Sequence, residues 1–276
     1  MSPQLSLYAD PQAEAAGAVA AVAASLPLSF APAPAQGPAK DGSPDVIAVA
    51  GHAGWTQRAA EAIRGGAKGV VVSSPVPEDV DLLAEAAAES GSAVVLDQRW
   101  AGNAAIAGSN GKVDTVIGGA LANAALLDSV AVAPPGTEPL QLLTEQLSVI
   151  VQCGIELRNP RMIQRSPNGY TVAATLPNGA PAALQGIMSS ALPATATVSV
   201  LTSNGSADVV LPDPAAAWPA EVRAVTAAGA TTLPTLYESA HRTSWARAHS
   251  HVTSGNPAGD LAQFTAVMAL LSQLTG

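Results

Sequence analysis

The side chains in this sequence best suited to acid–base or metal chemistry are four histidines: His52, His241, His249 and His251. His241 and His249 are eight residues apart, so on a helix they would lie about two turns apart on one face. No acidic residue is spaced to complete a metal site with them. The segment also carries two arginines, which suit the last turn of a solvated helix. We therefore expect a solvent-exposed helix end here and no metal site.

Nucleophilic catalysis has little support in the sequence. No Gly-x-Ser-x-Gly string occurs. Ser203 is followed by Asn204 and Gly205, a composition typical of a turn. The single cysteine, Cys153, lies in an apolar stretch without a neighbouring base, so we expect a buried, unreactive thiol. One cysteine also excludes an internal disulfide and cysteine-based zinc or iron–sulfur sites. No catalytic residue is assigned from the sequence.

His52 stands where open α/β sheets bind their ligands, directly after a predicted strand. Gly51 and Gly54 flank it and Trp55 follows, so an aromatic floor beside a polar group is one interpretation and a purely structural role is the other. Residues that end neighbouring predicted strands would line the same crevice. The candidate crevice residues are Asp10, His52, Trp55, Ser73, Ser74, Arg99 and Trp100. For Asp10, which precedes a proline, a helix-capping role is more typical than ligand binding.

The elements that would position these residues alternate between buried strands and helices. Strands that are apolar on both faces, separated by helices, indicate a parallel sheet covered on both sides. The chain begins with an apolar run, an Ala-rich helix and a short strand. A Pro/Gly-rich loop then leads into the alternating strands and helices. The predicted strands are Leu5–Asp10, Leu28–Ala31, Asp45–Ala50, Gly69–Val72 and Ala93–Leu96, and the helices are Gln12–Leu26, Trp55–Arg64 and Glu78–Ser90. The acids of this last helix are expected on its exposed face.

The second part of the chain has the alternation of an antiparallel sheet, with Asn-Gly turns between strands. A helix precedes the sheet and two helices follow it. The predicted strands are Tyr170–Leu176, Pro181–Ser190, Thr195–Thr202, Ala207–Leu211 and Glu221–Ala227, and the helices are Leu140–Gly154, Leu236–His249 and Gly259–Leu274.

Composition and charge exclude several classes of partner. The 276 residues carry a formal net charge of −9 and no basic stripe, which argues against nucleic acid and against an anionic membrane surface. No run of about 18 apolar residues occurs. Met1–Asp10 has no Lys or Arg, so no signal peptide is expected. We expect a cytoplasmic protein.

The order of elements and several strings resemble the Gfo/Idh/MocA oxidoreductase family, which pairs a Rossmann domain with an open-faced sheet domain. Pro44–Trp100 has the family's cadence of strand, helix, strand, helix, strand and an Arg-aromatic pair. Tyr170–Ser190 and Val198–Pro212 resemble its two Asn-Gly hairpins. The resemblance implies an α/β fold class: a truncated Rossmann-like parallel sheet domain over residues 1–105, then an α+β domain with an open-faced, mainly antiparallel sheet over residues 106–276.

Three parts of the family's hydride-transfer machinery are missing. The Gly-x-Gly-x-x-Gly turn that holds the cofactor pyrophosphate is absent, and with it, we expect, the whole first βα unit. The family's Glu-Lys-Pro reads Ser73-Ser74-Pro75, and a serine hydroxyl does not replace the lysine ammonium. The family's Asp-x-x-x-His falls on Leu140 and Thr144, with Glu145 as the only acid nearby.

These losses favour a Gfo/Idh/MocA homologue, sugar dehydrogenase-like in origin, that has lost NAD(P) binding and catalysis. It would act as a non-catalytic binding or partner subunit. The C-terminal sheet would join it to a second copy or to a related oxidoreductase, and a sugar-like ligand in the old crevice is compatible with this. The alternative is an active NAD- or NADP-dependent sugar or polyol oxidoreductase whose cofactor site is atypical or completed by a partner.

Overall fold

A computed structural model describes residues 4–32, 43–107, 112–213 and 218–276. The chain forms two compact units. Unit 1 comprises Met1–Gln98 and Ala240–Thr265, and unit 2 comprises Arg99–Ser239 and Ala266–Gly276. The expected division into residues 1–105 and 106–276 places the first boundary close to the observed one. It does not include the return of Ala240–Thr265 to unit 1.

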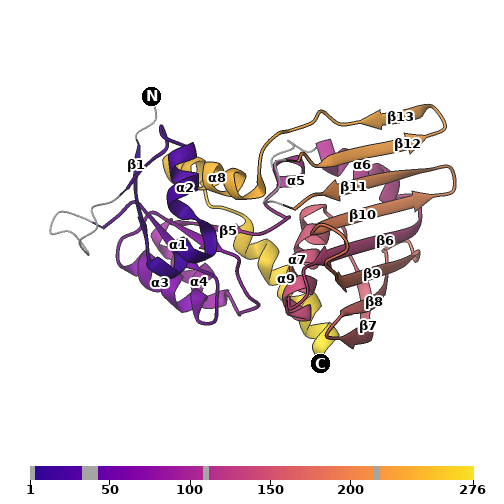
Figure 1. The fold of residues 1–276 in the computed structure, drawn as a ribbon, viewed down its shortest axis with the longest axis horizontal. Helices are drawn as coiled ribbons and strands as arrows, with labels where there is room; N and C mark the ends of the chain where they lie inside the picture. Colours follow the sequence, from indigo (N-terminus) through magenta and orange to yellow (C-terminus); the bar gives the residue numbers. More distant parts are fainter. Residues whose placement is uncertain (1–3, 33–42, 108–111, 214–217) are drawn as a thin grey trace. The chain divides into compact units, whose positions relative to one another are not determined.

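Unit 1 is built on a five-stranded sheet in which all neighbouring strands are parallel (Figure 1). The strand order is β2-β1-β3-β4-β5. A full Rossmann sheet has the order 3-2-1-4-5-6, and removing any one of its first three strands leaves the order seen here. The strands are β1 (Leu5–Ala9), β2 (Phe30–Pro32), β3 (Val46–Ala50), β4 (Gly69–Ser73) and β5 (Ala93–Asp97).

Helices cover both faces of this sheet, as the apolar strands predicted. On one face, α1, α2 and α8 pack their apolar side chains, including Val22 and Trp245, against Ala48, Val71 and Val95 of the strands. The helices α3 and α4 pack against each other, and α3 contacts β3 and β4. The helices of unit 1 are α1 (Pro11–Gly17), α2 (Val19–Ser25), α3 (Trp55–Arg64), α4 (Asp81–Ser90), α8 (Ala240–Ser254) and the first residues of α9 (Asp260–Thr275).

The expected single helix over Gln12–Leu26 is wrong, because the chain breaks it at Ala18. Ala18 has φ 43° and ψ 46°, the left-handed conformation that ends α1 and precedes α2. Its N–H donates to the carbonyl of Glu14. The side chain of Glu14 accepts from Ala20 N at 2.8 Å and so caps the start of α2.

Unit 2 is built on an eight-stranded sheet in the order β13-β12-β11-β10-β6-β9-β8-β7. Every neighbouring pair is antiparallel except β6 and β9. One face packs against α6, α7 and the end of α9 in a large apolar core (Figure 1). The strands are β6 (Ala124–Ala133), β7 (Arg158–Ser166), β8 (Gly169–Thr175), β9 (Pro181–Met188), β10 (Thr195–Thr202), β11 (Gly205–Leu211), β12 (Glu221–Thr226) and β13 (Gly229–Thr232), and the helices are α5 (Ala104–Ala107), α6 (Lys112–Leu121) and α7 (Pro139–Gln152).

The predicted fold class is confirmed: a parallel, Rossmann-like α/β sheet and a larger, mainly antiparallel sheet with helices. Both Asn-Gly hairpins form where the sequence placed them. The side chain of Asn178 fixes its turn by donating to Ala124 O at 2.9 Å and accepting from Ala180 N at 3.0 Å. The edge strands β7 and β13 and the central strand β6 were not predicted.

Candidate functional site

The carboxyl ends of β4 and β5 bring two polar side chains together in unit 1. Ser73 ends β4 and Asp97 ends β5, and the two residues are paired in the parallel register. Their side chains therefore point to the same face of the sheet, the one covered by α1, α2 and α8. Both are buried: Ser73 is 1% exposed and Asp97 is 7% exposed.

His241, the second residue of α8, completes this cluster. Its Nδ1 forms a hydrogen-bonded ion pair with the Asp97 carboxylate, and its side chain is 29% exposed. Burial alone would lower the pKa of His241. The hydrogen bond and negative charge of Asp97, with the backbone of Gly17, outweigh that effect and raise the pKa above its ordinary value of 6.5. The prediction of a solvated helix end at His241 is therefore wrong.

The last residue of α1 closes the cluster. A Cβ placed on Gly17 would lie 2.3 Å from Ser73 Oγ, which is too close for any side chain larger than glycine's, and 3.7 Å from His241 Cε1, which is ordinary contact. The Ser73 hydroxyl has no hydrogen-bond partner among the described residues. α1 thus packs directly onto the end of β4, at the position where the family resemblance would place Glu-Lys-Pro.

The strand order reverses between β1 and β3, and this switch point is where such sheets bind ligands. Asp10 follows β1 and caps α1, because its carboxylate accepts from Ala13 N at 2.6 Å. The helix-capping role expected of Asp10 is confirmed. His52 follows β3 and is exposed, and its Nε2 lies 3.0 Å from Gln12 Oε1.

The loops after β3 and β4 are joined tightly at this edge. Gly51 N donates to Ser73 O at 2.8 Å, and Val76 N donates to Gly51 O at 2.7 Å. Ser74, between them, is exposed and has φ 53°, a left-handed conformation that is uncommon for serine. The structure thus brings Asp10, His52, Ser73 and Ser74 to one edge of the unit 1 sheet.

Trp55 does not form the floor of a crevice. It is fully buried, donates from Nε1 to Val76 O at 2.9 Å and packs edge-on against Phe264. It is a core residue that fixes the start of α3. The N–H groups of Gly54 and Thr56 at this helix start are taken by Glu78, which the sequence placed on an exposed helix face.

Arg99 and Trp100 belong to unit 2. Trp100 is fully buried in the core of that unit, so the interpretation of its ring as a crevice wall is wrong. The Arg99 guanidinium carbon lies 5.4 Å from the centre of the Trp100 ring, and its backbone N–H donates to Glu145 at 3.1 Å.

The two remaining histidines do not join the cluster. His249 stacks edge-on against Phe30, and His251 Nδ1 lies 3.2 Å from Asn256 O. Within the described ranges, no three His, Cys, Asp or Glu side chains are grouped to hold a metal ion. In the same part of the chain, no helix is both long and apolar enough to span a bilayer.

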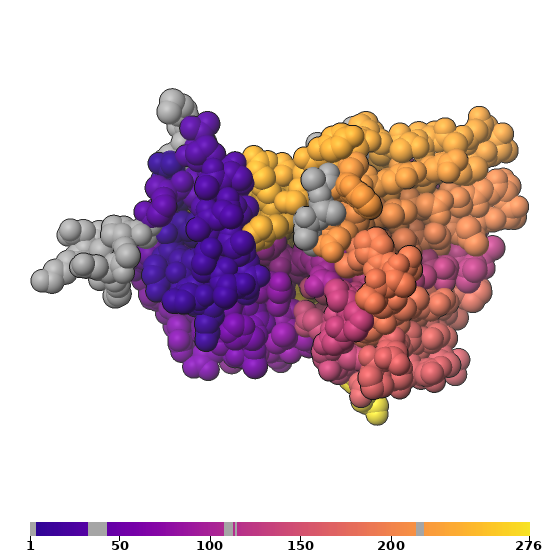
Figure 2. Space-filling model, viewed as in Figure 1, coloured from indigo at the N-terminus to yellow at the C-terminus, as the bar shows by residue number. Residues whose placement is uncertain are grey.

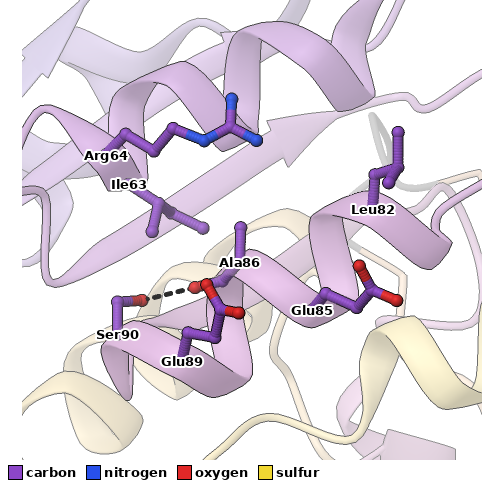
Figure 3. Close-up of a pocket in the computed structure, with 7 residues that line it drawn as sticks. All are labelled: Ile63, Arg64, Leu82, Glu85, Ala86, Glu89 and Ser90. Atoms are coloured by element: carbon purple, nitrogen blue, oxygen red, sulfur yellow. Dashed lines mark hydrogen bonds between the residues drawn. The ribbon is translucent and has the colours of Figure 1, made fainter.

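A shallow hollow of about 280 Å³ lies between α3 and α4 (Figure 3). Arg64 projects from α3, and Glu85 and Glu89 project from α4, with the exposed Leu82 at one end. Ser90 is engaged with the carbonyl of Ala86. The residues that line this hollow do not pair a nucleophile with a base, so we do not assign a reaction to it.

Solved structures of sugar-modifying oxidoreductases share this fold. KijD10, a 3-ketoreductase from Actinomadura kijaniata in complex with NADP, matches with TM-score 0.67 and 15% identity, covering 99% of this chain and 89% of that chain. UDP-N-acetylglucosamine 3-dehydrogenase GnnA from Acidithiobacillus ferrooxidans matches with TM-score 0.62 and 16% identity, covering 96% and 87%. Aldose-aldose oxidoreductase from Caulobacter crescentus matches with TM-score 0.57 and 15% identity, covering 83% and 76%. No protein-family model and no curated protein sequence matches the chain.

The residues at the switch point do not fit a dinucleotide. A pyrophosphate needs free backbone N–H groups at a helix N-terminus, and here the Asp10 carboxylate occupies that position. α1 is only seven residues long, and the carboxylate of Glu14 within it is engaged with Ala20 N at the start of α2. The guanidinium of Arg58, in the helix after β3, is engaged with the carbonyls of Ala50 and His52. A phosphate would therefore meet the Asp10 carboxylate at this position.

Proposed function

We propose that this chain is a Gfo/Idh/MocA-type homologue that has lost NAD(P) binding and hydride transfer and acts as a non-catalytic binding or partner subunit. The fold supports the relationship, since both sheets match those of the sugar oxidoreductases. The observation that carries the proposal is the helix start at the switch point, where Asp10 caps α1 and takes an N–H group that a pyrophosphate would need.

The sheet is consistent with the loss of the family's first, glycine-rich βα unit. β1 lies beside β3 at the switch point, and the turn after it, Asp10-Pro11-Gln12, contains no glycine. The packing of Gly17 against Ser73 fills the region above β4 with helix backbone. The missing phosphate site and the close packing of α1 onto the end of β4 favour the same conclusion, because each would prevent the cofactor from binding.

A calorimetric titration of the full chain with NADPH and NADH tests this part of the proposal. We expect no saturable heat up to millimolar dinucleotide. KijD10, which binds NADP, serves as the positive control under the same conditions. Stoichiometric binding to this chain would favour the alternative, an active oxidoreductase with an atypical or partner-completed cofactor site.

The partner part of the proposal rests on the outer face of the unit 2 sheet. Among the described elements of this unit, the helices pack on the opposite face. The outer face carries partly exposed apolar side chains on three strands, namely Ile187, Leu201 and Val210. An uncovered sheet face of this kind is typical of a subunit contact. We infer that it joins two copies of the chain or the chain to a related oxidoreductase.

Sedimentation of the purified chain at micromolar concentration tests the contact. We expect an oligomer, or co-purification of a related oxidoreductase, that Ile187→Asp on the outer face disrupts. Leu82→Asp is the matched control, because Leu82 is 75% exposed on α4 in unit 1. A strict monomer that never co-purifies with another chain would overturn the partner role.

A further inference from the structure

A larger hollow of about 610 Å³ lies in unit 1 between the strands β1 and β2 and the helices α1 and α2. This volume is within the range of small-molecule binding sites. Part of the segment 4–32, drawn in indigo, is visible on the face of unit 1 shown in Figure 2. The hollow is separate from the cluster of Ser73, Asp97 and His241, none of which lines it.

The walls of this hollow are apolar and are built by small residues on α2 and by one aromatic ring on β2. On α2, Ala20, Ala23 and Ala24 face the hollow and leave space that longer side chains would fill. On β2, Phe30 contributes an aromatic ring. Phe30 is held in place by the edge of Trp245, with the ring centres 5.4 Å apart. An apolar ring would therefore find preformed contacts here.

The polar side chains that line the hollow offer hydrogen-bond acceptors to a ligand. Glu14 is the only charged residue among the described residues that line the hollow, and no Lys or Arg does so. One carboxylate oxygen of Glu14 accepts from Ala20 N, which fixes the side chain at the rim. The amide nitrogen of Gln4 donates to the carbonyls of Pro27 and Phe30, so its oxygen is left as an acceptor. A ligand here must bring the donors.

We propose that this hollow binds a small molecule consisting of an apolar ring system with a single amino group. The ring would pack between Phe30 and the alanines of α2, and the ammonium would pair with Glu14. Phosphates and carboxylates are disfavoured, because an anion would meet Glu14 without a compensating cation. The inference does not depend on the loss of NAD(P) binding, since it rests on different residues.

Calorimetry on the full chain with tryptamine, tryptophol and indole-3-acetate tests the proposal. The three probes share an indole ring and differ in carrying an ammonium, a hydroxyl or a carboxylate. We expect saturable binding of one tryptamine per chain, at least about tenfold tighter than indole-3-acetate, as one charge-assisted hydrogen bond would give. Absence of saturable tryptamine binding, or equal affinity for the acid, would overturn the proposal.

Three variants locate the site. Ala20→Phe fills the hollow and is expected to abolish tryptamine binding. Ala21→Phe is the matched control, because Ala21 is exposed on the same helix and does not line the hollow. Glu14→Gln keeps an acceptor for Ala20 N and removes the charge, so it should bring tryptamine down to the affinity of tryptophol. Circular dichroism establishes that each variant is folded. Unchanged binding by Ala20→Phe would place the ligand elsewhere and refute the site.

Discussion

Replacing Gly17 with alanine should destabilise unit 1, because the added methyl group has no room above β4. The new Cβ would lie 2.3 Å from Ser73 Oγ and 3.0 Å from Ser73 Cβ. Both distances are well below van der Waals contact, and Ser73 is buried at the end of a central strand, so it cannot move aside freely. Either α1 shifts away from the sheet or the strand end distorts.

The magnitude follows from two opposing effects. Forcing a methyl group into a packed site costs about 1–3 kcal/mol. Alanine in place of glycine in a helix returns about 0.5–1 kcal/mol. The packing cost is the larger of the two, so Gly17→Ala should lower the free energy of unfolding by about 1–2 kcal/mol.

Urea unfolding followed by circular dichroism measures this change, with two comparison variants. Gly118→Ala in α6 meets no atom within 4 Å and should be neutral or slightly stabilising. Ser73→Gly removes both atoms that the new methyl group would strike, so the double variant should recover most of the loss. If Gly17→Ala is as stable as Gly118→Ala, or if Ser73→Gly gives no recovery, the packing of α1 onto β4 is refuted.

Three further substitutions are expected to change stability in defined directions. Ser73→Ala removes a buried hydroxyl that has no hydrogen-bond partner in the described part of the chain and should stabilise the protein by about 1 kcal/mol, measured by the urea midpoint. His241 has a raised pKa, so its ion pair with Asp97 stabilises the fold below about pH 6.5 and this contribution is lost as the pH rises through the raised pKa. His241→Gln should therefore flatten the fall in unfolding free energy between pH 6 and pH 9. Tyr170→Phe leaves the buried Gln146 Oε1 without its donor and should cost about 1–3 kcal/mol in thermal or urea unfolding.

Much of the fold could be predicted because local signals agree with the tertiary structure. The helix Trp55–Arg64 has the predicted bounds, since Gly54 and Gly65 mark its two ends. The strands of unit 1 are apolar on both faces and so indicate a covered parallel sheet. Ala18 carries no such signal: alanine is the best helix former, and the left-handed break depends on how two short helices pack.

The candidate site could be predicted only in part, because its central pair is joined across 144 residues. The acid that ends the apolar strand Ala93–Asp97 was a usable signal, since a buried carboxylate requires a partner. His241 was not recognisable as that partner, because its neighbours along the helix are polar and basic. α8 also belongs to unit 1 although it is far along the chain from the strands of that unit, and local sequence patterns do not reveal this.

Native mass spectrometry of the purified full-length chain, sprayed with and without 1 mM NADP, tests the central claim most directly. One spectrum reports both the assembly state and any bound cofactor. Our account predicts an oligomer, or a complex with a related oxidoreductase, whose mass contains no dinucleotide under either condition. A monomer carrying one NADP per chain would contradict both the lost cofactor site and the role as a partner subunit.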